Sequence, residues 1–483
     1  MSAATDAFVA READRFVEEW RAICRIPSVS GAGEPIAAAA DWIETRLTPL
    51  FDSVRRIEIP GHGPLLAATL NGSGDGRLLL YTHYDVQPVG DVDAWRSPPF
   101  AAELRDGAVW ARGACDDKAD VVARLHALEA WLATRGGERP PYTVIYLSDP
   151  AEEIGSPGLA AALVEHAADL RADACLWESF LRDEDGCPGI GFGCRGNLEV
   201  RLDLRLLKAD QHTAFAAIVR SAPLELMRAV ASMTDGRGRV TIDGFHDDVL
   251  APTPQQLETA AQIPLPREAV TLEGSDVSPF WAVDGDASRD ADAAGSASGA
   301  AGADAVGSPP SAPSAADAEL ARRLVFEPSL SVSQMLVGAD GVGSVPAQAS
   351  VTLRFSLVPD QDPQRVFEAV AAHLGAHGFA DVRLTSGRMI FPAASPLDTP
   401  FARATVDAAR DVFGEPVVYP VLIGAGPGRI VLDALGAPVV SPAGTLRPDG
   451  NMHGPDEHGA VADYLDHVRF TARLFERLAE NGF

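Results

Sequence analysis

Acidic residues and histidines occur in five short segments of this sequence, in patterns that suit metal binding. They are His83 and Asp85 in LLLYTHYD, Asp116 and Asp117 in RGACDDK, Glu152 and Glu153 in DPAEE, Glu178 in CLWE, and His453 in NMHGPDE. Imidazole and carboxylate groups are the ligands that a borderline cation such as zinc or manganese requires. Each residue alone also has an ordinary explanation, since Asp116 or Asp117 could simply cap a helix. Several such groups converging on one place would indicate a metal site.

An adjacent pair of glutamates suits a site with two metal ions. Two cations that share one carboxylate would hold a hydroxide between them and polarise a carbonyl group. A neighbouring carboxylate that binds no metal would then move protons. Glu152 and Glu153 could divide these two tasks between them. The pattern therefore predicts metal-assisted hydrolysis.

Most of these candidates follow apolar runs of strand length. The runs span residues 78–81, 143–147, 174–177 and 438–440, and segments with helical spacing of apolar residues, at about 8–23, 36–50 and 121–132, accompany them. This alternation predicts an α/β domain with a largely parallel sheet. Because ligands bind outside the carboxyl ends of such strands, the candidate residues should meet at one edge of the sheet.

A different pattern begins near Gly196, where apolar and charged residues alternate up to Leu206. Alternation of this kind predicts a strand with one face in water. A helix at about 224–233, a strand at 349–357, a helix at 364–374 and a strand at 382–385 follow. We therefore expect an inserted α+β domain at 195–388, between two parts of the α/β domain at 1–194 and 389–483.

Within the expected insertion, residues 284–317 are almost wholly Ala, Gly, Ser, Pro and Asp. Such a composition buries too little apolar surface to offset the entropy of ordering. We expect an acidic, disordered surface loop.

The overall composition argues against several kinds of partner. The formal net charge is -28, whereas nucleic-acid binding needs a basic surface. The sequence contains no apolar run of about 18 residues that would span a membrane. Its first twenty residues mix acidic and basic side chains and lack the apolar centre of a signal peptide. We expect a cytoplasmic protein that binds neither nucleic acid nor membrane.

Taken together, the quoted segments resemble the co-catalytic two-metal peptidases. That family includes aminoacylase, carnosinase-type dipeptidases, glutamate carboxypeptidase and succinyl-diaminopimelate desuccinylase. The resemblance covers nearly the whole chain and rests on the HxD, RGxxDxK, EE and HxPxE segments. It implies a zinc-peptidase-like catalytic domain and two divalent metal ions, zinc in the first place, with manganese or cobalt as alternatives.

The resemblance also implies a role for each matched residue. His83 and Glu178 would bind the first metal, and Asp85 would orient the His83 ring from behind. Glu153 and His453 would bind the second metal. Asp116 would bridge the two metals, and Glu152 would be the general base.

In that family the inserted domain is a ferredoxin-like lid that commonly mediates dimerisation. A histidine of the lid reaches the active site of the partner subunit and stabilises the oxyanion. The segment KADQHTAF offers His212 for this role. The resemblance thus implies a homodimer.

Three positions depart from the family and concern the substrate. RFSLVP places Ser356 where carnosinase-like members have Arg, Ala425 replaces a serine that contacts the substrate carboxylate, and Ala119 replaces a glycine. Arg354 lies on the same face of the expected strand as Ser356 and is a candidate substitute. Gly426, in the glycine-rich segment, is the second candidate for substrate contact.

The function predicted from these residues is hydrolysis of a small amide, by a dipeptidase or carboxypeptidase-like enzyme. An N-acyl-amino-acid deacylase of the aminoacylase or desuccinylase type is the alternative, and a non-catalytic metal-stabilised binding protein is a third. Residues 424–430, GAGPGRI, lack the GxGxxG spacing of a dinucleotide site. The sequence contains no GxSxG element of a serine hydrolase.

Overall fold

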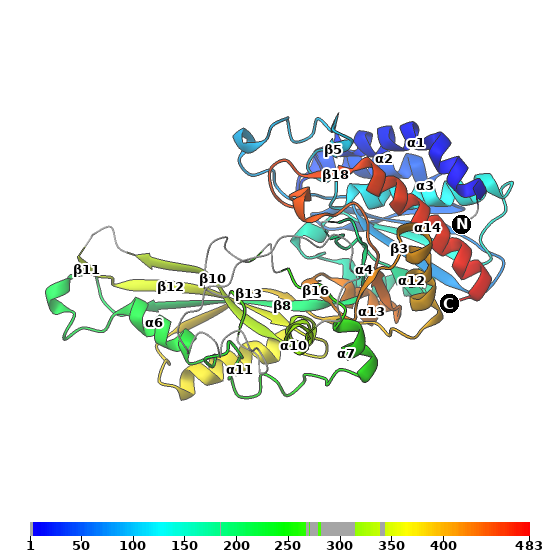
Figure 1. Cartoon of the computed structure of the whole chain (residues 1–483). Helices are drawn as coiled ribbons and strands as arrows, with labels where there is room; N and C mark the ends of the chain where they lie inside the picture. Colours follow the sequence, from blue (N-terminus) through cyan, green and yellow to red (C-terminus); the bar gives the residue numbers. More distant parts are fainter. Residues whose placement is uncertain (1–2, 184, 267–269, 271–278, 282–313, 339–342) are drawn as a thin grey trace, which may run out of the picture. The chain divides into compact units, whose positions relative to one another are not determined.

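A computed structural model of the chain describes residues 3–183, 185–266, 270, 279–281, 314–338 and 343–483. These residues form two compact units (Figure 1). Unit 1 comprises Met1–Cys194, Ala393–Leu422 and Gly426–Phe483, and unit 2 comprises Arg195–Pro392 and Ile423–Ala425. Unit 2 extends beyond the expected residue 388, because strand β13 (Arg383–Ile390) continues past it.

Most of the expected loop at 284–317 lies outside the described residues. Its last residues differ from the expectation, because helix α10 (Ala315–Phe326) begins within it. The side chain of Ser314 accepts a hydrogen bond from the backbone N–H of Asp317 at 3.1 Å. A serine at this position satisfies one of the free N–H groups of the first turn. The composition of the segment alone did not reveal this helix cap.

Unit 1 is built on a twisted sheet whose central strands are parallel. Its strands, in spatial order, are β1 (Ser53–Ile59), β2 (Gly63–Leu70), β6 (Thr143–Asp149), β3 (Arg77–His83), β7 (Ala174–Leu176), β17 (Val439–Ser441) and the first part of β8 (Gly189–Arg205). The antiparallel hairpin β1–β2, which the sequence analysis did not predict, adds to β6 at one side. The largely parallel sheet is therefore confirmed.

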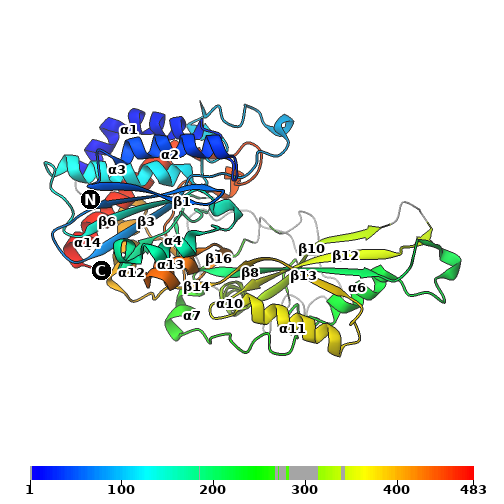
Figure 2. The same ribbon diagram turned by 180° about the vertical axis from the view of Figure 1, so that it is seen from behind.

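Helices cover both faces of this sheet, as Figure 1 and, from behind, Figure 2 show. One face packs against α1 (Ala3–Cys24), α2 (Gly33–Leu47), α3 (Lys118–Thr134), α12 (Pro400–Phe413) and α14 (Val461–Asn481). The other packs against α4 (Leu159–Glu165), α5 (Ala167–Leu170) and α13 (Gly428–Leu435). Leu78 and Leu80 enter the first core, whereas Leu79 and Tyr81 enter the second. This alternation explains why the strand is apolar along its whole length.

A small antiparallel sheet in unit 1 brings distant parts of the chain together. It consists of β4 (Glu103–Arg105), β5 (Ala108–Trp110) and β18 (His458–Ala460). Pairing of β18 with β5 places the residues that follow His453 beside the residues that precede Asp116.

Unit 2 is an antiparallel sheet with helices on one face. Its strand order is β10 (Ser329–Gly338), β12 (Gln348–Leu357), the second part of β8 and β13 (Arg383–Ile390). Helices α6 (Ala222–Ala231) and α11 (Pro363–Ala376) contribute to its core. The chain order β8, α6, β10, β12, α11, β13 is ferredoxin-like, with α7 (Pro254–Ala260) and α10 added after α6. The expected inserted α+β fold is confirmed.

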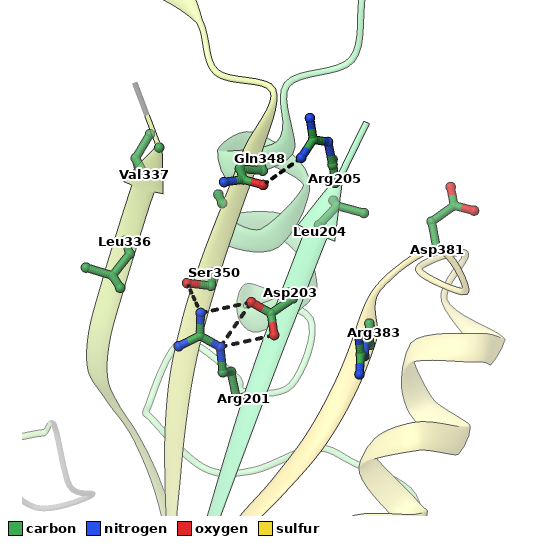
Figure 3. Close-up of a pocket in the computed structure, with 12 residues that line it drawn as sticks. Arg201, Asp203, Leu204, Arg205, Leu336, Val337, Gln348, Ser350, Asp381 and Arg383 are labelled. Carbon is green, nitrogen blue, oxygen red and sulfur yellow. Dashed lines mark hydrogen bonds and ion pairs between the residues drawn. The ribbon is translucent and has the colours of Figure 1, made fainter. Parts of the chain in front are cut away.

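The other face of the unit 2 sheet carries polar side chains around a hollow of about 680 Å³ (Figure 3). Here Arg201 donates from Nε to Asp203 and from Nη2 to the Ser350 hydroxyl, both at 3.0 Å. The hollow holds none of the candidate metal ligands.

All five cysteines are free. In the described part of the chain, every helix is too short or too polar to cross a bilayer.

Candidate metal centre

The strand ends of unit 1 carry the candidate residues to one edge of the sheet. β3 ends at His83, which lies beside Asp149 at the end of the parallel strand β6. The short helix Glu152–Ile154 follows β6, and Glu178 follows β7. Asp116 and Asp117, joined by a cis peptide bond, directly precede helix α3.

Three of these residues form a first ligand cluster, namely His83, Asp116 and Glu178. Nε2 of His83 lies 3.1 Å from Oδ1 of Asp116 and 3.3 Å from Oε2 of Glu178. The His83 side chain is fully buried, so its ring is fixed by its surroundings.

Asp116, Glu153 and His453 form a second cluster. Nε2 of His453 lies 2.8 Å from Oδ2 of Asp116 and 3.2 Å from Oε2 of Glu153. His453 has a left-handed backbone (φ 63°), which is uncommon for a residue other than glycine. Asp116 thus turns one carboxylate oxygen toward each cluster.

The donor atoms within each cluster lie within 4.8 Å of one another. Each cluster combines one imidazole nitrogen with carboxylate oxygens, and the two clusters share one carboxylate. This is the donor chemistry of zinc, manganese and similar divalent cations. The residues therefore fit two divalent metal ions.

Opposite charges shift the pKa values of these ligands. Burial opposes a charge on His83, but Asp116, Asp85 and Glu178 outweigh it and raise its pKa well above the usual range. Asp116 and Glu153 raise the pKa of His453 to about 10. Burial opposes ionisation of Asp116, yet His453 and His83 lower its pKa. Protons thus occupy the histidines when no metal does, and a cation has to displace them.

Asp85 contacts both the first histidine and the glutamate pair. Nδ1 of His83 lies 3.1 Å from the backbone oxygen of Asp85 and 3.3 Å from its Oδ1. The Asp85 carboxylate also accepts hydrogen bonds from the backbone N–H groups of Glu152 (3.0 Å) and Glu153 (3.2 Å). One buried carboxylate therefore fixes parts of both sites.

Glu152 differs from its neighbour in its surroundings. Gln87 donates to the Glu153 carboxylate from its side chain (2.8 Å) and its backbone (3.2 Å). Among the described residues, no hydrogen bond reaches the carboxylate of Glu152. Burial, and then the charge of Glu178, raise the pKa of Glu152 well above its usual range. A carboxylate that is held by its backbone and prefers a proton is suited to proton transfer.

Asp117 and Lys118 directly follow Asp116 in the sequence and make contacts that hold the surrounding backbone. Asp117 occupies the N-cap position of α3, but its side chain makes no capping hydrogen bond. Its Oδ2 instead accepts the backbone N–H of His83 at 3.0 Å. Lys118 donates to the backbone oxygen of Ile26 at 2.6 Å, and burial lowers its pKa to about 8.

Glu457, which was not among the predicted site residues, holds the segment that carries Asp116. Its buried carboxylate accepts hydrogen bonds from the backbone N–H groups of Gly113 (3.0 Å), Cys115 (3.1 Å) and Asp116 (3.3 Å). Arg112 donates to it at 2.5 Å. Gly113 has a φ of 83°, and a Cβ there would lie 2.6 Å from Val86. The sequence signals for this contact were Arg112 and Gly113, shortly before Asp116, and the segment PDE, which ends at Glu457 shortly after His453.

The remaining candidates lie outside both clusters. His212 is exposed on β9 (Gln211–His212) in unit 2, and its Nδ1 accepts the backbone N–H of Ala214 at 3.1 Å. Arg354, also in unit 2, forms a surface ion pair with Glu199 at 3.2 Å. Gly426 belongs to unit 1, where an added Cβ would lie 3.6 Å from Oε1 of Glu178.

With this geometry in place, comparison with known proteins identifies the family. The model of Peptidase family M20/M25/M40 matches residues 79–477. The match covers most of the chain and includes both ligand clusters. The chain therefore belongs to this peptidase family.

Individual relatives are similar over shorter stretches. Human beta-Ala-His dipeptidase is 28% identical over 210 residues, which cover 42% of this chain and 41% of the relative. Succinyl-diaminopimelate desuccinylase of Azoarcus sp. (strain BH72) is 30% identical over 215 residues, 44% of this chain and 55% of the relative. The chain thus spans about half the length of these curated relatives.

The fold is similar over its whole length to a solved structure. An M20 family metallo-carboxypeptidase from Sulfolobus solfataricus superposes with a TM-score of 0.79 at 27% identity, covering 96% of this chain and 99% of the other.

Proposed function

We propose that this protein hydrolyses small amide bonds with two divalent metal ions, as a dipeptidase or carboxypeptidase-like peptidase. The observation that carries the proposal is the pair of ligand clusters that share Asp116, with Glu152 beside them. His83 and Glu178 would hold one ion, and Glu153 and His453 the other. We propose zinc as the metal, with manganese and cobalt as alternatives.

Bound metal ions would polarise the substrate carbonyl and make water a better nucleophile. The protein's own residues position the two sites and transfer the proton. Asp116 spaces the two sites, and Asp85 orients His83 and the backbone of the glutamate pair. Glu152 takes a proton from the attacking water and passes it to the leaving nitrogen.

Deacylation of N-acyl amino acids is the second candidate, because the family comparison includes a succinyl-diaminopimelate desuccinylase. The two candidates differ in what lies on the acyl side of the scissile bond. The departures at Ser356 and Ala425 concern the other end of the substrate, where the family resemblance implies contacts to a free carboxylate. Arg354 is already paired with Glu199, which weakens its candidacy as the replacement.

The test begins with metal analysis of purified protein, followed by a hydrolysis screen. Dipeptides with free and with amidated carboxyl ends, and N-acetyl and N-succinyl amino acids, separate the candidates. Glu152→Gln is the matched control, because it keeps the shape of the side chain but cannot accept a proton. It should retain two metals and lose orders of magnitude in turnover. Two bound metals with no hydrolysis by the unaltered protein would favour a binding protein instead.

We also propose a homodimer formed through unit 2, with His212 acting on the substrate of the partner subunit. Two observations support this. Nδ1 of His212 is an acceptor, so a neutral ring carries its proton on Nε2 and can donate to an oxyanion. Strand β10 lies at an edge of the described sheet and exposes Val332, Leu336 and Val337, a surface suited to pairing with another chain.

Mixing two inactive variants tests this arrangement. His212→Ala should lower turnover about a hundred- to a thousandfold while metal content stays unchanged. Heterodimers of His212→Ala and Glu152→Gln subunits should regain activity, because one of their two composite sites is intact. Heterodimers without recovered activity would show that His212 does not act in trans.

A further inference from the structure

Helix α3 carries a fully buried pair of charges behind the first ligand cluster. Asp120 and Arg124 lie one turn apart, and Nη2 of Arg124 donates to Oδ2 of Asp120 at 3.0 Å. Neither residue belongs to a ligand cluster. Burying two charges is costly, and their attraction repays that cost only when further hydrogen bonds satisfy both groups.

The guanidinium of Arg124 finds those further partners on three backbone carbonyls. It donates to Leu176 at 2.6 Å, and also to Tyr81 and Trp177. Tyr81 lies two residues before His83, and Trp177 directly precedes Glu178. Arg124 therefore contacts the backbone just before both non-shared ligands of the first cluster.

Arg124 acts where the sheet itself no longer joins the two strands. The parallel pairing of β3 with β7 has its last described position at Leu80 and Leu176. Beyond this point the strands lead to His83 and Glu178 without a direct ladder between them. A planar guanidinium with several fixed donors can bridge carbonyls of both strands, which a lysine ammonium cannot do in the same geometry.

Asp120 secures the chain on the far side of Glu178. The hydroxyl of Ser179 lies 2.7 Å from Oδ1 and 2.6 Å from Oδ2 of Asp120. Nε2 of His467, on helix α14, lies 3.2 Å from Oδ1 of Asp120. The backbone at Glu178 is thus tied from both sides, by Arg124 at Trp177 and by Asp120 at Ser179.

The ligands outside this pair are held by other groups. Glu457 and Arg112 hold the segment of Asp116, and Gln87 holds Glu153. We propose that Asp120 and Arg124 form a clamp that positions His83 and Glu178, and so sets the affinity of the first metal site without setting that of the second. The inference rests on the proposed function, since it assumes that both clusters bind metal.

The test uses Arg124→Lys in the full chain, which keeps the positive charge but cannot bridge the two strands. Protein stripped with a chelator is titrated with zinc. The unaltered protein should bind two equivalents. Arg124→Lys should keep one at wild-type affinity and bind the other about 10- to 100-fold more weakly, the usual cost of losing a partner behind a ligand.

Arg195→Lys is the matched control for loss of a buried guanidinium. Arg195 lies in unit 2 and also donates to three backbone carbonyls, those of Leu324, Glu327 and Ser356. Arg195→Lys should bind both equivalents normally, whatever its effect on melting temperature.

Combined variants identify the weakened site. Adding Glu178→Ala to Arg124→Lys should leave the remaining tight equivalent in place, whereas adding Glu153→Ala should remove it. If Arg124→Lys does not fold, Ser179→Ala loosens the clamp more gently and should weaken one equivalent about 3- to 10-fold, which is less than the full cost of losing a partner behind a ligand.

The outcomes separate the two proposals. Normal binding of both equivalents by a folded Arg124→Lys or Ser179→Ala protein would overturn the clamp alone, as would equal weakening of both. An unaltered protein that binds fewer than two equivalents would overturn the proposed two-metal function, and the clamp with it.

Discussion

Replacing Glu457 with Gln should show that a buried carboxylate holds the shared ligand in place. Glu457 is bound by Arg112 and by the backbone N–H groups of Gly113, Cys115 and Asp116. Glutamine has nearly the same shape but only one acceptor oxygen. Its NH2 group would face either Arg112 or the backbone donors, so at least one contact becomes repulsive.

The size of the effect follows from these contacts. Breaking a buried ion pair by removing one partner costs about 3–5 kcal/mol, because the other charge stays buried. After the change, Arg112 would keep a hydrogen bond to the backbone oxygen of Pro88, at 3.3 Å. Unit 1 has about 280 residues, so its unfolding entropy is about 0.6 kcal/mol/K. The melting temperature of unit 1 should therefore fall by about 5–8 °C.

The assay measures melting in chelator and metal content in its absence, because bound metal stabilises the fold by itself. Glu457→Gln should lower the melting temperature and also weaken both metal sites, since both depend on Asp116. Glu476→Gln is the control. Glu476 is buried on α14 and pairs with Arg135 at 2.9 Å, with no contact to a ligand. It should lower the melting temperature and leave metal binding unchanged. Wild-type metal affinity in Glu457→Gln would show that Glu457 does not hold Asp116 in place.

Asp116→Ala removes a ligand from both clusters, so the purified variant should contain almost no metal by elemental analysis; two retained metals would exclude the bridging role. The pKa of about 10 at His453 lies above its unfolded value, so His453 is protonated at neutral pH in stripped protein. Zinc affinity should therefore rise about tenfold per pH unit between pH 6 and 8 for each proton that zinc displaces. Calorimetry should detect the release of one proton fewer on zinc binding to His453→Gln than to the unaltered protein. Deleting residues 285–312, which include no candidate ligand, should leave turnover within about threefold, and a larger loss in a folded protein would contradict this.

The clustering of the candidate ligands was predictable because each one belongs to a short-range pattern. His83 is the last residue of the apolar strand β3, and Glu178 follows soon after the apolar strand β7. Parallel strands bring their carboxyl ends to the same edge. The prediction that His83 and Glu178 meet does not depend on how far apart they lie in the sequence. The ferredoxin-like order of unit 2 was likewise expected from the family resemblance and from alternating strands.

The residues that hold the ligands were not predictable in the same way. Glu457 acts on backbone N–H groups more than 340 residues earlier in the chain, and backbone donors leave no trace in side-chain patterns. Arg124 lies in the predicted helix at 121–132, and burial on every side of α3 cannot be inferred from residue spacing. The hairpin β1–β2 was overlooked because three of the seven residues of Ser53–Ile59 are charged, so this strand has no clear apolar run.

The interruption of unit 1 by unit 2 has a consequence for the order in which the metal centre is completed during synthesis. All three residues of the first cluster have been synthesised once the chain reaches Glu178, whereas the second cluster lacks its last residue until His453. At about 5–20 residues per second, the roughly 275 residues between them take about 15–55 s to translate. Helices α12 and α14, which complete one face of the unit 1 core, also emerge only after unit 2. A nascent chain stalled inside unit 2 therefore holds all three residues of the first cluster and two of the three residues of the second.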